Sequence, residues 1–189
     1  LFALPYQAFE ANDVVDAFRY MQQAKQIGKI VITYRQPVLP RAIASASPSL
    51  TLNAKASYLV TGGVSGFGFK TAQWLVEKGA KHLVLISRGG QLAADEQLAV
   101  AQMTQDGVSV WVRACDVSDR TAMAALFADM AKKLPPLKGI VHAAAVIEDS
   151  LICNQATAQI ERVFTPKIEG ALNLHELSLG LPLDFFVLY

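Results

Sequence analysis

Four glycines lie in the twelve-residue stretch YLVTGGVSGFGF, positions 58–69, where backbone N–H groups could approach a bound group closely. They follow Thr61 and are Gly62, Gly63, Gly66 and Gly68. Because glycine lacks a Cβ, such a loop can enclose a pyrophosphate, and the N-terminus of a following helix adds partial positive charge. A tight turn without a ligand is the alternative. The β-forming residues before the loop and the helical pattern after it favour nucleotide binding.

Ser87 and Arg88 bear on which dinucleotide would bind. An acidic residue about 20 positions past the glycine loop usually binds the ribose 2′-hydroxyl of NAD. This chain has Ser87-Arg88 at the end of the next β pattern instead. A guanidinium can bind a 2′-phosphate, which a carboxylate would repel. The pair therefore predicts NADPH rather than NADH, and a solvated surface arginine is the alternative.

Two further β patterns end in residues that could contact a dinucleotide. Asp116 follows the third pattern, where its carboxylate could accept a hydrogen bond from the adenine amino group. It could equally be a turn or cap residue just before Ser118, and both interpretations stay open. The fourth pattern ends in HAAA, 142–145, whose small side chains would let a nicotinamide ribose lie against the backbone. Close packing of a helix on a strand would require the same small residues.

These candidates follow strands that alternate with helices. The apolar runs predict strands at 57–61, 82–87, 108–114, 139–144 and 184–189. Helical spacing predicts helices at 66–78 and 92–105, a third capped by Ser118 and ended by Pro135-Pro136, and a helical region to about residue 179. Strands that read as near-continuous apolar runs indicate a parallel sheet covered on both faces. The predicted fold class is therefore α/β, a doubly wound, Rossmann-type parallel sheet.

The chain divides at residues 35–56, which are rich in Ala, Ser and Pro and show no clean period. We interpret this stretch as a linker. Residues 1–34 contain one helical pattern and a strand at 29–34, too little for a domain, so we interpret them as the tail of an upstream domain. Residues 57–189 carry the α/β pattern. Both ends look cut, which predicts an internal piece of a longer chain with a truncated sheet.

The composition argues against several other classes of function. The chain has 17 basic and 16 acidic residues, so neither nucleic acid nor an anionic membrane is indicated. It has no bilayer-spanning apolar run and no signal-peptide pattern. Cys115 and Cys153 lack the spacing of metal ligands, as do His82, His142 and His175, so no metal site is predicted. The two cysteines instead indicate a reduced, cytoplasmic setting. Packing or surface positions are expected for the three histidines.

Five motifs in order, TGGVSGFG, LISR, CDVSD, GIVHAA and FTPKIEGALNLHEL, resemble the β-ketoacyl ketoreductase domain of polyketide synthases and related fatty acid synthases. That domain belongs to the short-chain dehydrogenase/reductase superfamily, and the resemblance covers residues 57–189. Residues 1–34, especially DAFRYMQQAKQIGKIVIT, look like the C-terminal end of an enoylreductase domain. The resemblance thus implies that the chain spans a junction between an enoylreductase and a ketoreductase.

The resemblance implies a role for each candidate residue. The four glycines after Thr61 would line the phosphates of NADPH, and Arg88, with Ser87 beside it, would bind the 2′-phosphate. Adenine would lie between Asp116 and Val117, and the nicotinamide ribose along Ala143 and Ala144. Lys167, in the PK of the helix after the fourth strand, would hold the ribose and lower the pKa of a catalytic tyrosine. Without the resemblance, Lys167 would read as a surface residue.

The implied reaction is NADPH-dependent reduction of a β-ketoacyl thioester to a β-hydroxyacyl thioester. The substrate would be carried on the phosphopantetheine arm of an acyl carrier protein, among neighbouring synthase domains. A tyrosine would protonate the developing alkoxide and a serine would hydrogen-bond to it, both beyond Tyr189 in the family pattern. Two alternatives are a non-catalytic nucleotide-binding or scaffold module of such a synthase and a free-standing reductase of small alcohols. The enoylreductase-like block argues against the second.

Two departures from the family pattern stand close to the expected nicotinamide position. The family commonly has glycine where this chain has Ala145, and the extra methyl group could crowd the pocket or shift its backbone. Many bacterial modules read Leu-Asp-Asp where this chain has Ile147-Glu148-Asp149. The second acid is retained at Asp149, and Glu148 keeps the charge on a longer side chain.

Overall fold

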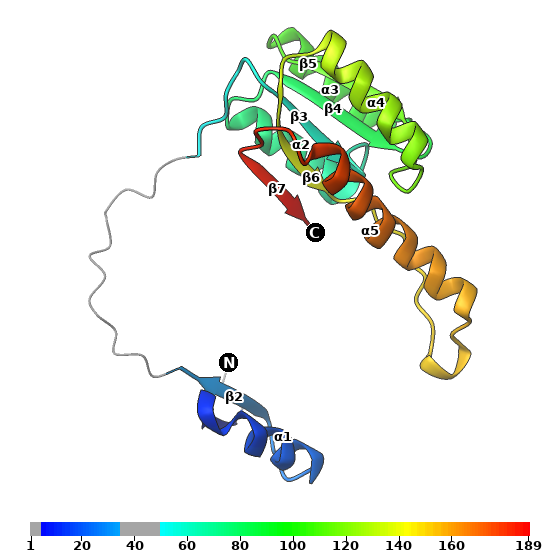
Figure 1. The fold of residues 1–189 in the computed structure, drawn as a ribbon. Coiled ribbons are helices and arrows are strands. Elements are labelled where there is room, and N and C mark those ends of the chain that lie inside the picture. The colour runs from blue at the N-terminus through cyan, green and yellow to red at the C-terminus, as the bar shows by residue number, and fades with distance from the viewer. Residues whose placement is uncertain (1–4, 35–49) are drawn as a thin grey trace, which may run out of the picture. The chain divides into compact units, whose positions relative to one another are not determined.

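The computed structural model describes residues 5–34 and 50–189, and the chain separates into two compact units, Leu1–Pro48 and Ser49–Tyr189 (Figure 1). Residues 35–49 of the predicted linker lie outside the described residues. Residues 50–56, its remaining part, pack on the second unit, where Leu52 and Ala56 are buried. The Leu52 N–H donates to the Lys78 carbonyl at 2.7 Å, so this part of the predicted linker is structurally continuous with the α/β unit.

The first unit holds a small parallel ribbon and one helix. Strands β1 (Tyr6–Glu10) and β2 (Lys29–Thr33) pair in parallel, and between them lie the 3₁₀ turn η1 (Ala11–Asp13) and helix α1 (Val14–Gln22). The helix and β2 occur where the sequence predicts them. The apolar side chains of Phe18 and Met21 on α1 are 66% and 47% exposed, and this unit on its own leaves them in contact with solvent.

The second unit is built on a parallel sheet, and the predicted fold class is confirmed. Within residues 50–189, five strands pair in the order β5-β4-β3-β6-β7, all in parallel. Their bounds are Ser57–Thr61 for β3, His82–Ser87 for β4, Ser109–Ala114 for β5, Leu137–His142 for β6 and Phe185–Leu188 for β7. The order reverses at β3, as in doubly wound folds, and the crevice at this switch point is where such folds bind ligands.

Helices cover both faces of this sheet (Figure 1). They are α2 (Gly66–Glu77), α3 (Ala94–Gln105), α4 (Arg120–Lys133) and α5 (Thr157–Ser178), with the short turn η2 (Ile152–Asn154) before α5. Along β3, Tyr58 and Val60 pack in the core formed with α2 and α3. Leu59 between them packs in the opposite core, formed with α4 and α5. This alternation explains why the strands read as continuous apolar runs.

Several predicted boundaries differ from the observed ones by one or two residues, and two of these differences bear on the site. Helix α4 is capped by Asp119, whose carboxylate accepts from the Ala122 N–H at 2.9 Å, whereas Ser118 was expected to cap it. Ser118 instead hydrogen-bonds to Asp116. Strand β6 ends at His142 rather than at residue 144, and the N–H groups of the next two residues donate to the carbonyl and hydroxyl oxygens of Thr61 at the end of β3. Among the described residues, none of the helices combines the length and apolar character that crossing a bilayer requires.

Candidate nucleotide-binding and active site

The predicted site residues gather at one edge of the sheet. Thr61, Ser87 and His142 are the last residues of β3, β4 and β6, and these strands run in parallel. Each candidate residue ends or follows one of these strands, follows β5, or lies on α5. The carboxyl ends of parallel strands lie at the same edge, so the chain order places the glycine loop, Ser87-Arg88, Asp116-Val117 and Ala143-Ala144 together. A hollow of about 420 Å³ that includes Ser57 lies at the opposite edge.

The glycine loop is shaped by close backbone contacts. A methyl group on Gly68 would lie 2.2 Å from the carbonyl oxygen of Gly62, so only glycine lets the first turn of α2 approach the loop this closely. Gly62 has φ +65°, and a methyl group there would lie 2.8 Å from the nitrogen of Ala144. Gly63 donates its N–H to the Ile86 carbonyl at 3.2 Å. These glycines therefore join β3, α2 and the segment after β6 into one compact junction.

Gly66 differs from the other three glycines of the loop. It begins α2 with φ +52°, a conformation that favours glycine, and a methyl group there would meet nothing within 4 Å. Open space therefore adjoins the N-terminus of a twelve-residue helix. Unpaired backbone N–H groups and the positive end of the helix dipole face such a space, which suits a phosphate group. The geometry of the loop thus fits the pyrophosphate of a dinucleotide.

Arg88 and Asp116 line a common pocket of about 260 Å³. The guanidinium-bearing Arg88 is exposed just after β4, and the Ser87 hydroxyl accepts from the Gly90 N–H at 3.0 Å, which shapes the turn after it. Asp116 accepts from both the backbone N–H and the hydroxyl of Ser118, at 2.9 and 2.6 Å. The turn role of Asp116 is therefore present, and the same residue also borders the pocket that Arg88 lines.

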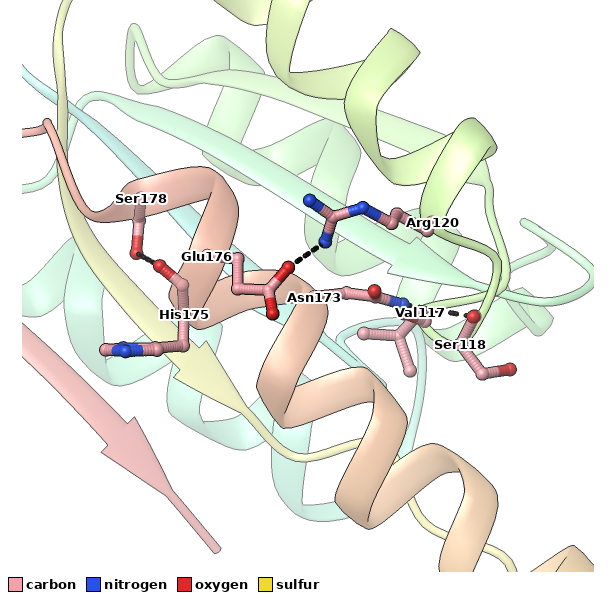
Figure 2. A network of polar contacts seen from close by, with 7 residues as sticks. All are labelled: Val117, Ser118, Arg120, Asn173, His175, Glu176 and Ser178. Carbon is pink, nitrogen blue, oxygen red and sulfur yellow. Dashed lines mark hydrogen bonds and ion pairs between the residues drawn. The ribbon is translucent and has the colours of Figure 1, made fainter.

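Asn173 of α5 is a functional candidate that the sequence reasoning missed. Its amide nitrogen donates to the carbonyls of Val117 and Ser118, each at 3.0 Å, and the side chain is buried (Figure 2). One turn away, Arg120 and Glu176 form an ion pair between α4 and α5. These bonds hold the predicted adenine-contacting loop against α5. The sequence signal was a polar residue beside Leu174 on the inward face of a helix, where an amide usually has a specific partner.

Lys167 lies at the same edge as the glycine loop. It is half-buried on α5, and its ammonium group donates to the carbonyl oxygen of Tyr189. The Tyr189 N–H in turn donates to the His142 carbonyl at 3.1 Å, directly after β7. The ring of Tyr189 contacts Phe67 of α2, with the ring centroids 4.7 Å apart. Lys167 is thus placed at the carboxyl ends of β6 and β7, and Tyr189, which it contacts, packs on α2.

His142 is buried between the glycine loop and α5. Its Nδ1 lies 2.6 Å from the Thr61 hydroxyl oxygen, its Nε2 lies 2.9 Å from the Pro166 carbonyl oxygen, and its side chain is only 1% exposed. Burial lowers the pKa of His142, and the positive charge of Lys167 lowers it further. The imidazole is therefore neutral at pH 7. His142 is therefore packed in the interior, one of the two positions expected for the histidines. It also makes two specific hydrogen bonds, which were not predicted.

This burial predicts a pH dependence of stability. Because the folded pKa of His142 is below its unfolded value of about 6.5, the unfolded chain binds the proton first as the pH falls. The contribution to stability is complete above pH 6.5 and is lost as the pH drops towards the folded pKa. Urea unfolding at pH 7.5 and 5.5 should show a lower free energy of unfolding at pH 5.5. The difference should shrink in His142→Gln, and an equal difference in both proteins would contradict this assignment.

The two departures after β6 have distinct surroundings. Ala145 is exposed, so its methyl group points to solvent in this arrangement rather than into the core. Glu148 forms a bidentate ion pair with Arg162 of α5, at 2.9 and 2.7 Å, and the hydrogen bond from Arg162 lowers the pKa of the carboxyl group. The longer arm of Glu148 is therefore used to connect the loop to α5.

Comparisons with known proteins identify the relatives of this chain. The family model described as "KR domain" matches residues 56–189. The chain is 34% identical over 184 residues to highly reducing polyketide synthase 40 of Fusarium mangiferae, covering 97% of the chain and 7% of that protein. It is 36% identical over 189 residues to the phenolphthiocerol synthesis polyketide synthase Pks15/1 of Mycobacterium marinum, covering 100% of the chain and 8% of that protein. The chain thus spans only a small part of these relatives.

Solved structures agree with this assignment. An A-type ketoreductase from a modular polyketide synthase is 39% identical with a TM-score of 0.68, over 76% of this chain and 31% of that one. The first ketoreductase of the tylosin polyketide synthase is 32% identical with a TM-score of 0.65, over 77% of this chain and 31% of that one. The similarity therefore extends to the three-dimensional arrangement of the second unit.

Proposed function

The chain belongs to the KR domain family found in polyketide synthases, and we propose from this premise that it forms the cofactor-binding part of an NADPH-dependent β-ketoacyl reductase. The resemblance inferred from the five motifs is confirmed for the ketoreductase region. The assignment of residues 1–34 to the end of an enoylreductase remains a proposal, with 35–56 as the linker and 57–189 as the reductase part. Matches that cover 97% to 100% of the chain support a common synthase origin of both units.

One observation carries the proposal most directly. The open space at the start of α2, the pocket that Arg88 and Asp116 line, and the ammonium group of Lys167 all lie at the carboxyl edge of one parallel sheet. A dinucleotide bound across this edge could reach all of them, as ligands of doubly wound sheets do. A glycine-rich turn without a ligand would not require this convergence.

The residues present suit the two ends of NADPH. Backbone N–H groups at Gly66 and the start of α2 would hold the pyrophosphate, and Arg88 would bind the 2′-phosphate. Asp116 and Val117 would contact adenine, while Ala143 and Ala144 would lie along the nicotinamide ribose. NADPH would supply the hydride for reduction of the β-carbonyl carbon.

Lys167 would assist the proton transfer to the alkoxide that completes the reduction. Its ammonium group would hydrogen-bond to the ribose and, through its positive charge, lower the pKa of the tyrosine that protonates the alkoxide. We place that tyrosine, and the serine that hydrogen-bonds to the same oxygen, outside residues 1–189. The substrate would be a β-ketoacyl thioester on the phosphopantetheine arm of an acyl carrier protein, within a synthase that contains neighbouring domains.

Cofactor choice gives a direct test. We expect a complete reductase, which contains residues 57–189 together with the proposed serine and tyrosine, to bind NADPH more tightly than NADH. Arg88→Ala should cost about 1.5–3 kcal/mol of NADPH affinity, the usual contribution of a hydrogen bond to a charged group, with little change for NADH. Fluorescence titration with both cofactors measures this. Arg113→Ala removes an equal charge from β5, where the guanidinium lies 4.6 Å from the Trp111 ring centroid, and should leave both affinities unchanged.

The same protein tests the reaction. Absorbance of NADPH at saturating cofactor, followed with a β-ketoacyl thioester, should fall only when enzyme and thioester are both present. Equal affinity of the unmutated chain for NADH and NADPH would refute the cofactor assignment. Tight NADPH binding without any thioester reduction would instead favour the non-catalytic nucleotide-binding module.

A further inference from the structure

His142 connects two parts of the site through both of its ring nitrogens. The Pro166 carbonyl can only accept a hydrogen bond, so the His142 Nε2 at 2.9 Å must carry the proton. In the neutral ring, Nδ1 is then an acceptor, and the Thr61 hydroxyl at 2.6 Å is its donor. One buried side chain thus joins the last residue of β3 to a carbonyl group in α5.

The connection continues to the segment after β6. The Thr61 hydroxyl oxygen also accepts from the Ala144 N–H at 3.2 Å. A chain of hydrogen bonds therefore runs from Ala144 through Thr61 and His142 to Pro166, the residue immediately before Lys167. Ala144 is a proposed contact of the ribose, Thr61 begins the glycine loop, and Pro166 belongs to the helix that carries Lys167.

The turn of α5 at Pro166 is irregular in its backbone hydrogen bonding. Proline has no backbone N–H, so this turn lacks one of the hydrogen bonds of a regular helix. One turn later, a methyl group on Gly170 would lie 2.7 Å from Val117 and 3.3 Å from the His142 ring, which shows how closely the helix approaches. His142 is accordingly packed against the helix as well as hydrogen-bonded to it.

We propose that His142 is a positioning residue of the reductase, fixing the α5 turn that carries Lys167 relative to the glycine loop. This role rests on the proposed function, because it matters only if Lys167 and the loop act on one cofactor. The residue touches neither cofactor nor substrate. Its effect is to hold two groups at a fixed separation, and misplacement by about 1 Å at a reacting centre can cost 100-fold in rate.

Two substitutions separate the two hydrogen bonds of His142. In His142→Asn, the side-chain oxygen replaces Nδ1 as the acceptor for Thr61, but the side chain is too short to reach Pro166. In His142→Gln, the amide nitrogen replaces Nε2 as the donor to Pro166. Because β6 stays paired with β3 through the backbone, the bond to Pro166 is the one that holds α5 in place. We therefore expect the Asn variant to lose about tenfold or more in kcat, whereas the Gln variant stays within about threefold of wild type. His175→Gln, an exposed position on the same helix, is the matched control.

The experiment measures kcat, the NADPH dissociation constant and the thermal midpoint in the complete reductase that contains this chain, together with amide exchange at residues 167–171. Faster exchange at that turn in the Asn variant, but not in the Gln variant, is expected along with the loss of kcat. Equal activity in all proteins, or equal losses in both variants in step with their thermal midpoints, would overturn the positioning role alone. An unmutated complete reductase that reduces no thioester would overturn the proposed function, and the positioning role with it.

Discussion

Replacement of Lys167 by alanine is expected to lower turnover by about 100- to 10,000-fold, the range over which proton-transfer groups contribute to catalysis. The ammonium group lies at the carboxyl ends of β6 and β7, where the proposed ribose and tyrosine would meet it. Without it, the tyrosine would keep an ordinary pKa and transfer its proton less readily near pH 7. Stability should change by only about 0.5 kcal/mol, because the side chain is partly exposed and packs in no core.

A second lysine makes this prediction specific. Lys138 of β6 also donates to a backbone carbonyl, that of Pro182 at 2.7 Å, but it lies near the start of the strand rather than its end. Lys138→Ala in the complete reductase that contains this chain should therefore retain turnover with a β-ketoacyl thioester. Initial rates and thermal unfolding of both variants decide the matter. Turnover of Lys167→Ala within threefold of Lys138→Ala would return Lys167 to the class of surface lysines.

The positions of the strands, and their alternation with helices along the chain, were predictable because each strand is marked by its own local run of apolar residues. The strands at 57–61 and 82–87 were predicted with the bounds that the structure shows, since both are runs of buried apolar residues. The glycine loop was recognisable from its strand–loop–helix context. At Ser118 and Asp119, two good capping residues stand side by side, and the sequence pattern favoured the wrong one. The choice depends on the Asp116–Ser118 turn, which only the folded chain displays.

The connections within the site were not predictable, because they join residues that are distant in the sequence. Thr61 and His142 are 81 positions apart, His142 and Pro166 are 24 apart, and Asn173 lies 56 positions from Val117. Nothing in the local pattern of β6 or α5 indicates these partners. A histidine at the end of a strand and an asparagine on an inward helical face signal only that some partner is required.

The glycines illustrate a further limit of the sequence pattern. All four glycines of the loop were predicted to line phosphates, but a methyl group on Gly68 would lie 2.2 Å from the Gly62 carbonyl oxygen, whereas only Gly66 faces open space. Gly68 therefore also serves the junction between helix and loop, and its contact with a phosphate stays a prediction. This division of roles predicts how substitutions at the loop should behave.

Gly68→Ala should be among the most damaging single-methyl substitutions in the second unit. The obstructing atom is a backbone oxygen, which cannot rotate away, so α2 must move from the loop. Overpacking of this kind costs about 1–3 kcal/mol or more of the free energy of unfolding. Because the displaced helix N-terminus is the proposed phosphate site, NADPH binding should weaken as well. Urea unfolding and fluorescence titration measure the two effects.

Gly180→Ala provides the matched control for this experiment. A methyl group there would meet nothing within 4 Å, and the residue does not have a positive φ, so the same substitution adds no contact and no backbone strain. Its stability and NADPH affinity should equal those of the unmutated chain. If Gly68→Ala behaved like Gly180→Ala in both measurements, the first turn of α2 would not need its close approach to the loop. The junction could then not be what positions the helix end for a phosphate.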